Sequence, residues 1–341
     1  MIANDIRIVI AGAGSIGCYA GGCLAAAGKD VIFLVRPQVE AALGEHGLKV
    51  VDLDGTEKLI PPERLILTVD PVVAFDRADI ILVAVKSGST EEMAELIGHH
   101  APTTASVVSL QNGVGNAQVL HRKLPAGFTV VSGMVPFNVV QSELDVVPLT
   151  VRRTTEGTVL IDDKSGDLAD DLSVPGFNVR HEPDMQGVLW GKLLINLNNA
   201  PNALSNLPLS AQLSDRNWRL LLADQISEGI NVLKANGIKP GKVQGLSPLL
   251  LPWILRLPNF LFRIIAKKML NIDPRARSSM WEDLERGRPT EIDHLQGVIL
   301  DLAGKKNIDA PFTRRIVASI KQAEGKPLRS HTVEQIRNNL P

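Results

Sequence analysis

Hydrophobic positions at the start of the chain fall into two short runs separated by a helical stretch. Residues 8–10 (Ile-Val-Ile) form a β-branched run, which is typical of a buried strand. Small residues from about 15 to 27 predict a helix that ends at Gly28, and residues 31–35 form a second buried run. The chain therefore begins with a predicted strand–helix–strand unit.

The same alternation continues to about residue 183. Residues 80–85 are apolar throughout and 106–110 nearly so, as expected of parallel strands buried on both faces. Shorter runs predict an antiparallel extension of this sheet at residues 130–134, 145–151 and 158–161. Beyond Glu182-Pro183-Asp184 the spacing is almost entirely helical. We therefore expect an α/β domain over residues 1–183, followed by an all-helical domain over residues 184–341.

Two segments of the helical part stand apart. Residues 246–270 are strongly apolar, but prolines and arginines divide them, and no unbroken run approaches the ~20 residues of a membrane span. We expect short helices in a core or a dimer interface there, with a peripheral membrane patch as the alternative. The polar tail after Pro327 is expected to be poorly ordered.

The first turn carries glycines in G-x-G-x-x-G spacing, at Gly12, Gly14 and Gly17. In that spacing the first glycine makes the tight turn, the second lets the backbone approach a pyrophosphate, and the third allows close helix packing. Ser15 and Ile16 begin the helix, whose free N–H groups attract phosphate. The motif predicts a Rossmann-type dinucleotide site, with an ordinary glycine-rich loop as the alternative.

The end of the second strand indicates which dinucleotide binds. An NAD site places Asp or Glu there to accept hydrogen bonds from the ribose, whereas this chain has Arg36. A guanidinium can bind a 2′-phosphate through two hydrogen bonds. Arg36 therefore favours NADP(H), and a solvated surface arginine is the alternative.

Lys86 and Asn112 each follow a predicted parallel strand. Ligands of open α/β sheets bind outside the carboxyl ends of the strands, so both side chains are expected to face the cofactor. An exposed lysine and a turn asparagine are the alternatives.

Residues 185–207 are apolar at helical spacing, with Pro201 expected to break or kink the helix. Lys192, Asn196 and Asn199 fall on one face of it. Polar groups on an otherwise apolar helix are costly unless something polar faces them, so this stripe is a candidate site. A solvent-facing stripe is the alternative.

Composition gives no sign of nucleic-acid or metal binding. The formal net charge is −1, 45% of residues are hydrophobic and there is one Tyr, so nothing indicates nucleic-acid binding. Cys18 and Cys23 are the only cysteines and are expected to be small core residues, and no Cys/His cluster suggests a metal. Because the sequence runs directly into a strand, we expect no signal peptide and a cytoplasmic protein.

Together these residues resemble the ketopantoate reductase (2-dehydropantoate 2-reductase) family over nearly the whole chain. The likeness rests on G-x-G-x-x-G, VAVK ending at Lys86, LQNGVG at Asn112, WGKLLIN through Lys192 and Asn196, and SSMWEDLERGRPTEID through Ser279 and Glu291. It implies a Rossmann domain followed by a helical domain like that of 6-phosphogluconate dehydrogenase, with the active site in the cleft.

The resemblance also implies roles for individual residues. Lys192 would be the general acid and Glu291 the second catalytic residue. Substrate would be held by Asn112, Asn196 and Ser279. Lys86 would lie near the nicotinamide and the substrate carboxylate, and Arg36 on the cofactor phosphate. From the residues alone, Glu291 is equally explained as a first-turn carboxylate behind a Thr290 cap.

The family often has an asparagine directly before the proline that is Pro201 here, but this chain has Ala200 at that position. Asn199, next to it, could take the place of the missing asparagine. We therefore carry three hypotheses. The first is an NADPH-dependent reductase that makes pantoate from 2-dehydropantoate, on the route to pantothenate and coenzyme A, in a possible homodimer. The second is a reductase of the same fold acting on another 2-oxo acid or a ketone. The third is a non-catalytic NADP(H)-binding sensor.

Overall fold

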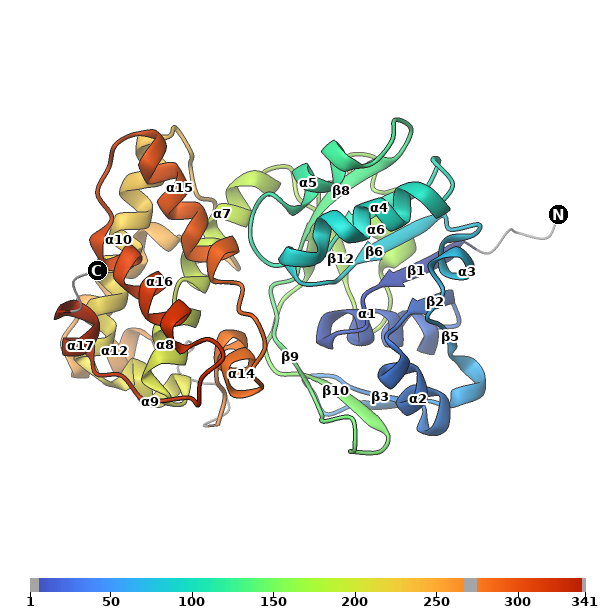
Figure 1. The fold of residues 1–341 in the computed structure, drawn as a ribbon, viewed down its shortest axis with the longest axis horizontal. Helices are drawn as coiled ribbons and strands as arrows, with labels where there is room; N and C mark the ends of the chain where they lie inside the picture. The colour runs from blue at the N-terminus through green and yellow to red at the C-terminus, as the bar shows by residue number, and fades with distance from the viewer. Residues whose placement is uncertain (1–5, 267–274, 339–341) are drawn as a thin grey trace. The chain divides into compact units, whose positions relative to one another are not determined.

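The chain divides into two compact units, Met1–Met185 and Gln186–Pro341. The computed structural model describes residues 6–266 and 275–338. Both β-sheets belong to the first unit, and the described part of the second unit is built of helices (Figure 1). The expected α/β class, with a Rossmann-type domain followed by a helical one, is confirmed.

The first unit is built on a sheet of strand order β12-β11-β8-β7-β6-β1-β2-β5. The strands from β5 to β8 in this order are all parallel, while β11 runs antiparallel to β8. The chain winds outward in both directions from β1, so the loops after β1 and β6 meet at the switch point where such sheets bind ligands. The strands are β1 (Arg7–Ala11), β2 (Asp30–Leu34), β5 (Ile66–Thr68), β6 (Ile80–Val83), β7 (Ser106–Ser109), β8 (Thr129–Met134), β11 (Val159–Ile161) and β12 (Val179–His181).

Helices cover both faces of this sheet. Alternate residues of β1 enter different cores: Ile8 and Ile10 pack on the side of α1, and Val9 and Ala11 on the side of α4 and α5. All four side chains are completely buried, which explains why β1 is apolar without alternation. The helices of the unit are α1 (Ser15–Ala26), α2 (Pro37–His46), α3 (Pro71–Phe75), α4 (Thr90–His100), α5 (Asn116–Lys123) and α6 (Asp167–Leu172).

A second, four-stranded sheet of order β4-β3-β10-β9 corrects one prediction. The run at 145–151 was expected to extend the main sheet, but β10 pairs parallel to β3 and antiparallel to β9 in the small sheet. Leu149 and Val151 of β10 are buried in the core that also contains α1. The runs at 130–134 and 158–161 do join the main sheet, although β8 is parallel to β7. The strands of the small sheet are β3 (Leu48–Val51), β4 (Glu57–Ile60), β9 (Val139–Gln141) and β10 (Leu149–Arg153).

Helix α1 lies between the two sheets, which explains its small residues. A Cβ added to Gly21 would lie 2.4 Å from the Phe33 ring of the main sheet, and one added to Gly22 would lie 2.5 Å from Val50 of the small sheet. Cys18 and Cys23 are free thiols buried in the same helix, and burial raises the pKa of each to about 12. Neither is a reactive thiol in this environment.

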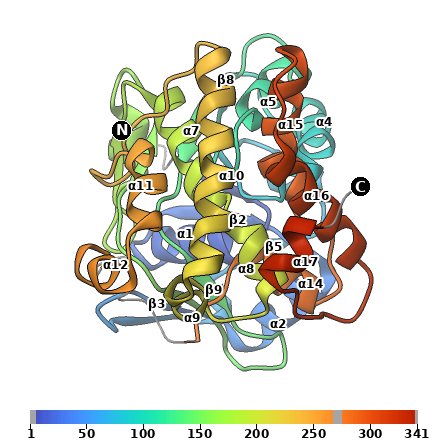
Figure 2. The same ribbon diagram turned by 90° about the vertical axis from the view of Figure 1, so that its left-hand side faces the viewer.

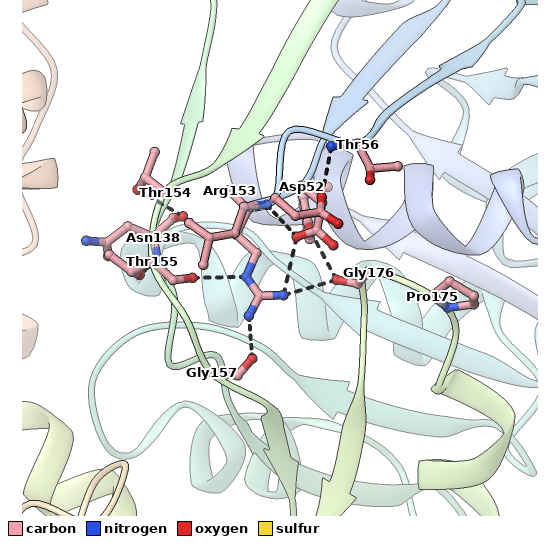
Figure 3. Close-up of polar contacts among 12 residues, drawn as sticks. Asp52, Thr56, Asn138, Arg153, Thr154, Thr155, Gly157, Pro175 and Gly176 are labelled. Carbon is pink, nitrogen blue, oxygen red and sulfur yellow. Dashed lines mark hydrogen bonds and ion pairs between the residues drawn. The ribbon is translucent and has the colours of Figure 1, made fainter. Parts of the chain in front are cut away.

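Arg153, at the end of β10, connects the small sheet to the neighbouring loops (Figure 3). Its guanidinium donates hydrogen bonds to the carbonyls of Thr155 (3.0 Å), Gly157 (2.7 Å) and Gly176 (3.4 Å). It also lies 3.6 Å from the Asp52 carboxylate, which accepts a hydrogen bond from the Tyr19 hydroxyl. The Arg153 side chain is only 10% exposed, so its removal takes this donor from the Thr155 and Gly157 carbonyls where water has little access.

In the second unit the longest helix, α10 (Arg216–Ala235), packs against α11, α15 and α16 (Figure 2). The tail after Pro327 was expected to be poorly ordered, but Val333–Asn338 form α17, and Ile336 is completely buried in a core with α8, α14 and α16. This buried isoleucine, the hydrogen bond from the His331 N–H to the Leu204 carbonyl (2.8 Å) and the ion pair of Arg337 with Asp224 (2.6 Å) hold the polar segment in place. The other helices are α7 (Met185–Asn196), α8 (Asn199–Ser205), α9 (Leu209–Ser214), α11 (Leu251–Arg256), α12 (Asn259–Ile265), α14 (Ser279–Glu285), α15 (Val298–Lys305), α16 (Pro311–Ala323) and α17 (Val333–Asn338).

The apolar segment 246–270 forms short helices, as predicted, with residues 267–270 outside the described part. Leu251, Ile254, Leu255 and Phe262 are buried. Large apolar side chains are also exposed on α11, on α12 and on the 3₁₀ turn Pro248–Leu250 that precedes them, and we call them the outer apolar surface: Leu249, Leu250, Trp253, Phe260, Leu261, Ile264 and Ile265. Among the described residues, no helix is long and apolar enough to cross a membrane.

Replacing Arg153 by Met tests the importance of its contacts. The Thr155 and Gly157 carbonyls lose this donor, and the Asp52 carboxylate and the Gly176 carbonyl each lose one of their partners, so we expect a loss of roughly 2–4 kcal/mol of stability. Thermal unfolding followed by circular dichroism measures the effect. The matched control is Arg152→Met, since Arg152 is the exposed neighbour on the same strand. Equal effects of the two substitutions would contradict the assignment.

Candidate active site

The glycine turn between β1 and α1 is closed on one side and open on the other. Gly12 has φ +112°, and a Cβ there would lie 2.7 Å from Val85. A Cβ on Gly17 would lie 1.9 Å from the Gly12 carbonyl oxygen, so the helix packs directly on the turn. A Cβ on Gly14 would have no atom within 4 Å. The backbone of Gly14 is therefore accessible to a ligand.

The N-terminus of α1 supplies the donors for this open side. Gly14 is the N-cap and has no side chain to occupy the free N–H groups of Ser15, Ile16 and Gly17. The first helical hydrogen bond runs from the Cys18 N–H to the Gly14 carbonyl, at 2.8 Å. Free amides, a helix dipole and an open Gly14 fit the pyrophosphate of a dinucleotide.

Arg36 lies two residues beyond β2, on the same edge of the sheet as the glycine turn. Strand β2 pairs in parallel register with β1, with Leu34 opposite Ala11, which aligns their carboxyl ends. Arg36 is exposed and forms the N-cap of α2, which starts at Pro37. Its charge is therefore accessible to an anionic group, as the sequence predicts for a 2′-phosphate.

Lys86 and Asn112 each lie three residues beyond a neighbouring strand, β6 and β7. Lys86 is exposed and Asn112 is half-buried. The two loops are joined through the Asn112 carbonyl, which accepts hydrogen bonds from the Ser87 hydroxyl (3.0 Å) and from the Asn116 amide (2.7 Å). The structure thus places both predicted residues on one edge of the sheet, together with Arg36 and the glycine turn.

Sequence reasoning missed the buried polar residues that hold these loops. Thr90 accepts a hydrogen bond from the Gln111 amide (2.7 Å) and lies 3.0 Å from the Asn116 amide oxygen. With Ser87, all are nearly inaccessible to solvent. Polar residues directly after apolar strands were the available signal, since such positions are buried only when they have partners.

In the second unit, Lys192 lies on α7 among apolar side chains. Burial disfavours its ammonium and lowers the pKa of Lys192 from 10.5 to about 8. The charge of Glu291 acts in the opposite direction and raises it. Lys192 is half-buried and desolvation is the largest influence on its amine, which favours the candidate site over a solvent-facing stripe.

Glu291 lies in a turn that other residues hold. The Glu324 carboxylate accepts hydrogen bonds from the N–H (3.0 Å) and the hydroxyl (2.6 Å) of Thr290. The Thr290 hydroxyl accepts the Ile292 N–H at 3.3 Å, so Thr290 does cap the turn. Glu291 itself is half-buried, and its charge acts on Lys192. Capping by Thr290 and a site role for Glu291 are therefore compatible.

The helix predicted over residues 185–207 is divided earlier than expected. α7 ends at Asn196 and α8 begins at Asn199, so the interruption precedes Pro201. Lys192 and Asn196 lie one turn apart on α7, whereas the assignment of Asn199 to their face assumed a continuous helix. Asn196 and Asn199 are half-buried, and Ala200 is completely buried in an apolar core.

Ser279 is the first residue of α14 and is exposed, while its neighbour Ser278 is buried. The Ser278 hydroxyl donates to the Asn199 carbonyl (2.9 Å), and its N–H donates to the buried Asn202 side chain (2.8 Å). α14 therefore starts directly beside α8, which brings Ser279 near Asn199. Sequence reasoning missed Asn202 and Ser278. Among the described residues, no cluster of His, Cys, Asp or Glu side chains is arranged to hold a metal ion.

Replacing Lys192 by Met should stabilise the protein at neutral pH. Because the pKa of Lys192 is lower in the folded chain than in the unfolded one, a charged Lys192 costs the folded state about 3 kcal/mol below pH ~8. This cost disappears as the pH rises toward 10.5. We expect Lys192→Met to raise Tm at pH 7 and much less at pH 10, as measured by calorimetry. The control is Lys239→Met at an exposed lysine, and a gain independent of pH would contradict the analysis.

Comparison with known proteins agrees with this architecture. The family model described as Ketopantoate reductase PanE/ApbA matches residues 8–166, and Ketopantoate reductase PanE/ApbA C terminal matches residues 184–324. The 2-dehydropantoate 2-reductase of Halobacterium salinarum is 29% identical over 329 residues, which cover 94% of this chain and 99% of that protein.

Solved structures show the same relationship. The PanE/ApbA family ketopantoate reductase from Ralstonia eutropha JMP134 is 30% identical, with a TM-score of 0.78 over 93% of this chain and 98% of that one. Two more distant structures share the fold, each over 93% of this chain and 98% of the other. D-mandelate dehydrogenase with NADH and anilino(oxo)acetate has a TM-score of 0.75 at 20% identity, and a dimeric ketopantoate reductase from Staphylococcus aureus has 0.67 at 16%. The chain therefore belongs to the ketopantoate reductase family, a family of oxidoreductases.

Proposed function

We propose that the chain is an NADPH-dependent reductase that converts 2-dehydropantoate to pantoate, on the route to pantothenate and coenzyme A. The observation that carries this proposal is Lys192, an amine with a pKa of about 8 beside Glu291, in a chain of this family. An acid whose pKa lies near the working pH is well suited to general acid catalysis.

In this proposal a nicotinamide dinucleotide binds to the first unit. Gly12, Gly14 and Gly17, with the N–H groups of Ser15 and Ile16, hold the pyrophosphate. Arg36 binds the 2′-phosphate, and Lys86 and Asn112 face the nicotinamide end from the next two strands. When bound, the reduced cofactor supplies a hydride to the substrate carbonyl carbon.

Lys192 acts on the substrate oxygen. This oxygen gains negative charge as the carbonyl is reduced, and the Lys192 ammonium donates a hydrogen bond and then a proton to it. Burial makes the ammonium a stronger acid, while the charge of Glu291 favours its protonated form. Glu291 also accepts a hydrogen bond from a substrate hydroxyl. Asn112, Asn196, Asn199 and Ser279 orient the substrate through hydrogen bonds.

A different 2-oxo acid remains the second candidate substrate, and Ala200 is the observation in its favour. Ala200 is completely buried, so it presents neither a polar group nor space where relatives often have an asparagine. The related fold of D-mandelate dehydrogenase was solved with anilino(oxo)acetate, a 2-oxo acid derivative. A non-catalytic NADP(H) sensor, the third hypothesis, does not require an amine of lowered pKa.

The proposal includes a homodimer formed through the outer apolar surface of α11 and α12. Trp253, Phe260 and Ile264 are 62%, 65% and 70% exposed, and the exposed Arg256 and Arg263 lie on the same two helices. Exposed aromatic residues together with arginines are typical of a protein interface. The related enzyme from Staphylococcus aureus is dimeric.

A cytoplasmic location stays a prediction from the sequence.

The substrate prediction is tested by NADPH oxidation with a panel of 2-oxo acids. We expect the highest kcat/KM for 2-dehydropantoate, and a higher value for another acid would reject this substrate.

The role of Lys192 is tested in the same assay. Lys192→Ala should lower kcat by about 10²–10⁴-fold while NADPH binding is retained. Since the acid must be protonated, the wild-type rate of reduction should fall above pH ~8. Turnover unaffected by Lys192→Ala would reject its role as the acid.

The cofactor prediction is tested at Arg36. Replacing Arg36 by Ala removes the partner of the 2′-phosphate, so Kd for NADPH should rise by about 10-fold or more while Kd for NADH changes little. Titration of cofactor fluorescence measures both constants. Arg64→Ala is the control for loss of a positive charge elsewhere in the unit. An equal rise in Kd for NADPH and for NADH would show that Arg36 does not bind the 2′-phosphate.

The dimer prediction is tested by light scattering after size exclusion. Trp253→Ser, Phe260→Ser and Ile264→Ser combined should convert a dimer to a monomer, because the centre of the interface is lost. The matched control is Leu59→Ser, Val72→Ser and Val73→Ser combined, which removes equally exposed apolar side chains from the first unit. A monomeric wild-type protein would reject the dimer.

A further inference from the structure

Pro201 leaves one backbone carbonyl between α7 and α8 without a helical partner. Pro201 is the third residue of α8 and has no N–H. The Leu197 carbonyl, four residues earlier, therefore receives no hydrogen bond from it. The adjacent bonds are present: the Leu197 N–H donates to the Leu193 carbonyl (3.0 Å), and the Asn202 N–H to the Asn198 carbonyl (3.0 Å). The kink thus depends on another donor for one oxygen.

Gln296 supplies that donor. Its side-chain amide donates a hydrogen bond to the Leu197 carbonyl at 3.0 Å, and the residue is completely buried. Its amide oxygen is buried without a hydrogen-bond partner among the described residues. Burying an unpaired amide oxygen is unfavourable, and a methionine of similar shape would avoid this cost. Gln296 therefore contributes through its single bond to the kink.

Gln296 belongs to the turn that carries Glu291. Residues Asp293–Gly297 form a π-helical turn, and the Glu291 carbonyl accepts the N–H groups of His294 (3.0 Å) and Leu295 (3.1 Å) just before it. π-helical turns are frequent at functional sites. Thr290, on the other side of Glu291, is held by Glu324. Glu291 is therefore fixed from both sides, by Thr290 and by the turn containing Gln296.

We propose that Gln296 is a positioning residue that links the Glu291 turn to the kink following the Lys192 helix, and thereby sets the distance between the carboxylate and the amine. Pro201 and Gln296 act as a pair: the proline leaves the Leu197 carbonyl open, and the amide occupies it. This inference rests on the proposed function for its importance in catalysis, but the contact itself can be tested without turnover.

The experiment compares Gln296→Met, which removes the donor at nearly constant volume, with Gln225→Met. Gln225 is also completely buried, and neither atom of its amide has a hydrogen-bond partner in the described structure, so it is a matched control. Glu291→Gln provides the limit in which the charge beside Lys192 is absent. Lys192 is titrated in each full-length protein by competitive acetylation across pH, followed by mass spectrometry.

Glu291 is the one charged group with a resolved influence on Lys192 within the described residues, and it raises the pKa of the lysine. We therefore expect Gln296→Met to move the Lys192 titration to lower pH, toward that of Glu291→Gln. Gln225→Met should leave it unchanged. In the reductase assay, Gln296→Met should lower kcat and shift the alkaline limb of the pH profile to lower pH, with KM for NADPH unchanged.

Pro201→Ala separates positioning from general stability. Alanine restores an N–H that can bond to the Leu197 carbonyl, so adding Gln296→Met in this background should reduce the thermal stability less than in the wild type. Such coupling is expected when two residues serve the same group. If Gln296→Met alone does not fold, the titration is made in the double variant.

A Lys192 titration unchanged by Gln296→Met would overturn the proposal, as would an equal shift in Gln225→Met. Failure of both the single and the double variant to fold, with Gln225→Met folded, would also overturn it, because the amide would then serve stability alone. If the wild type reduces no 2-oxo acid, the proposed function fails, but the titration still decides whether Gln296 positions Glu291.

Discussion

The constraint on which the second unit depends is the burial of one ammonium. Lys192 lies in an apolar helix where the charged form is disfavoured, and the lowered pKa of about 8 expresses that cost. Glu291 offsets part of it, and the turn that holds Glu291 is fixed through Thr290 and Gln296. A cost of this kind at one residue is typical of functional sites, where stability is given up for reactivity.

In the first unit the corresponding constraint is space. Side chains are excluded at Gly12 and Gly17, where the turn meets Val85 and the helix meets the turn, but not at Gly14, which opens to solvent. The small residues of α1 serve a different purpose, because this helix is enclosed by two sheets. Glycines that look alike in the sequence therefore serve two purposes: some leave the backbone open to a ligand, and others allow close packing between the sheets.

Much of the architecture follows from local pattern. Apolar strands followed by small-residue or amphipathic helices predict the parallel sheet, and the change of period near residue 184 predicts the helical unit. The strand at 145–151 was recognised as a strand but assigned to the wrong sheet, since β10 pairs with β3 about a hundred residues earlier. Alternation specifies which face of a strand is buried, but not which distant strand covers its edge.

The sequence alone determined the dinucleotide motif, the family, and the residue types needed for the proposed chemistry, because each depends on short spacings that the backbone fixes locally. Only the tertiary structure decided the state of those residues. The pKa of Lys192 depends on burial and on Glu291, 99 residues away, and the bond from Gln296 to the Leu197 carbonyl spans the same number of residues. Desolvation and charge act through space, so no pattern along the chain contains them.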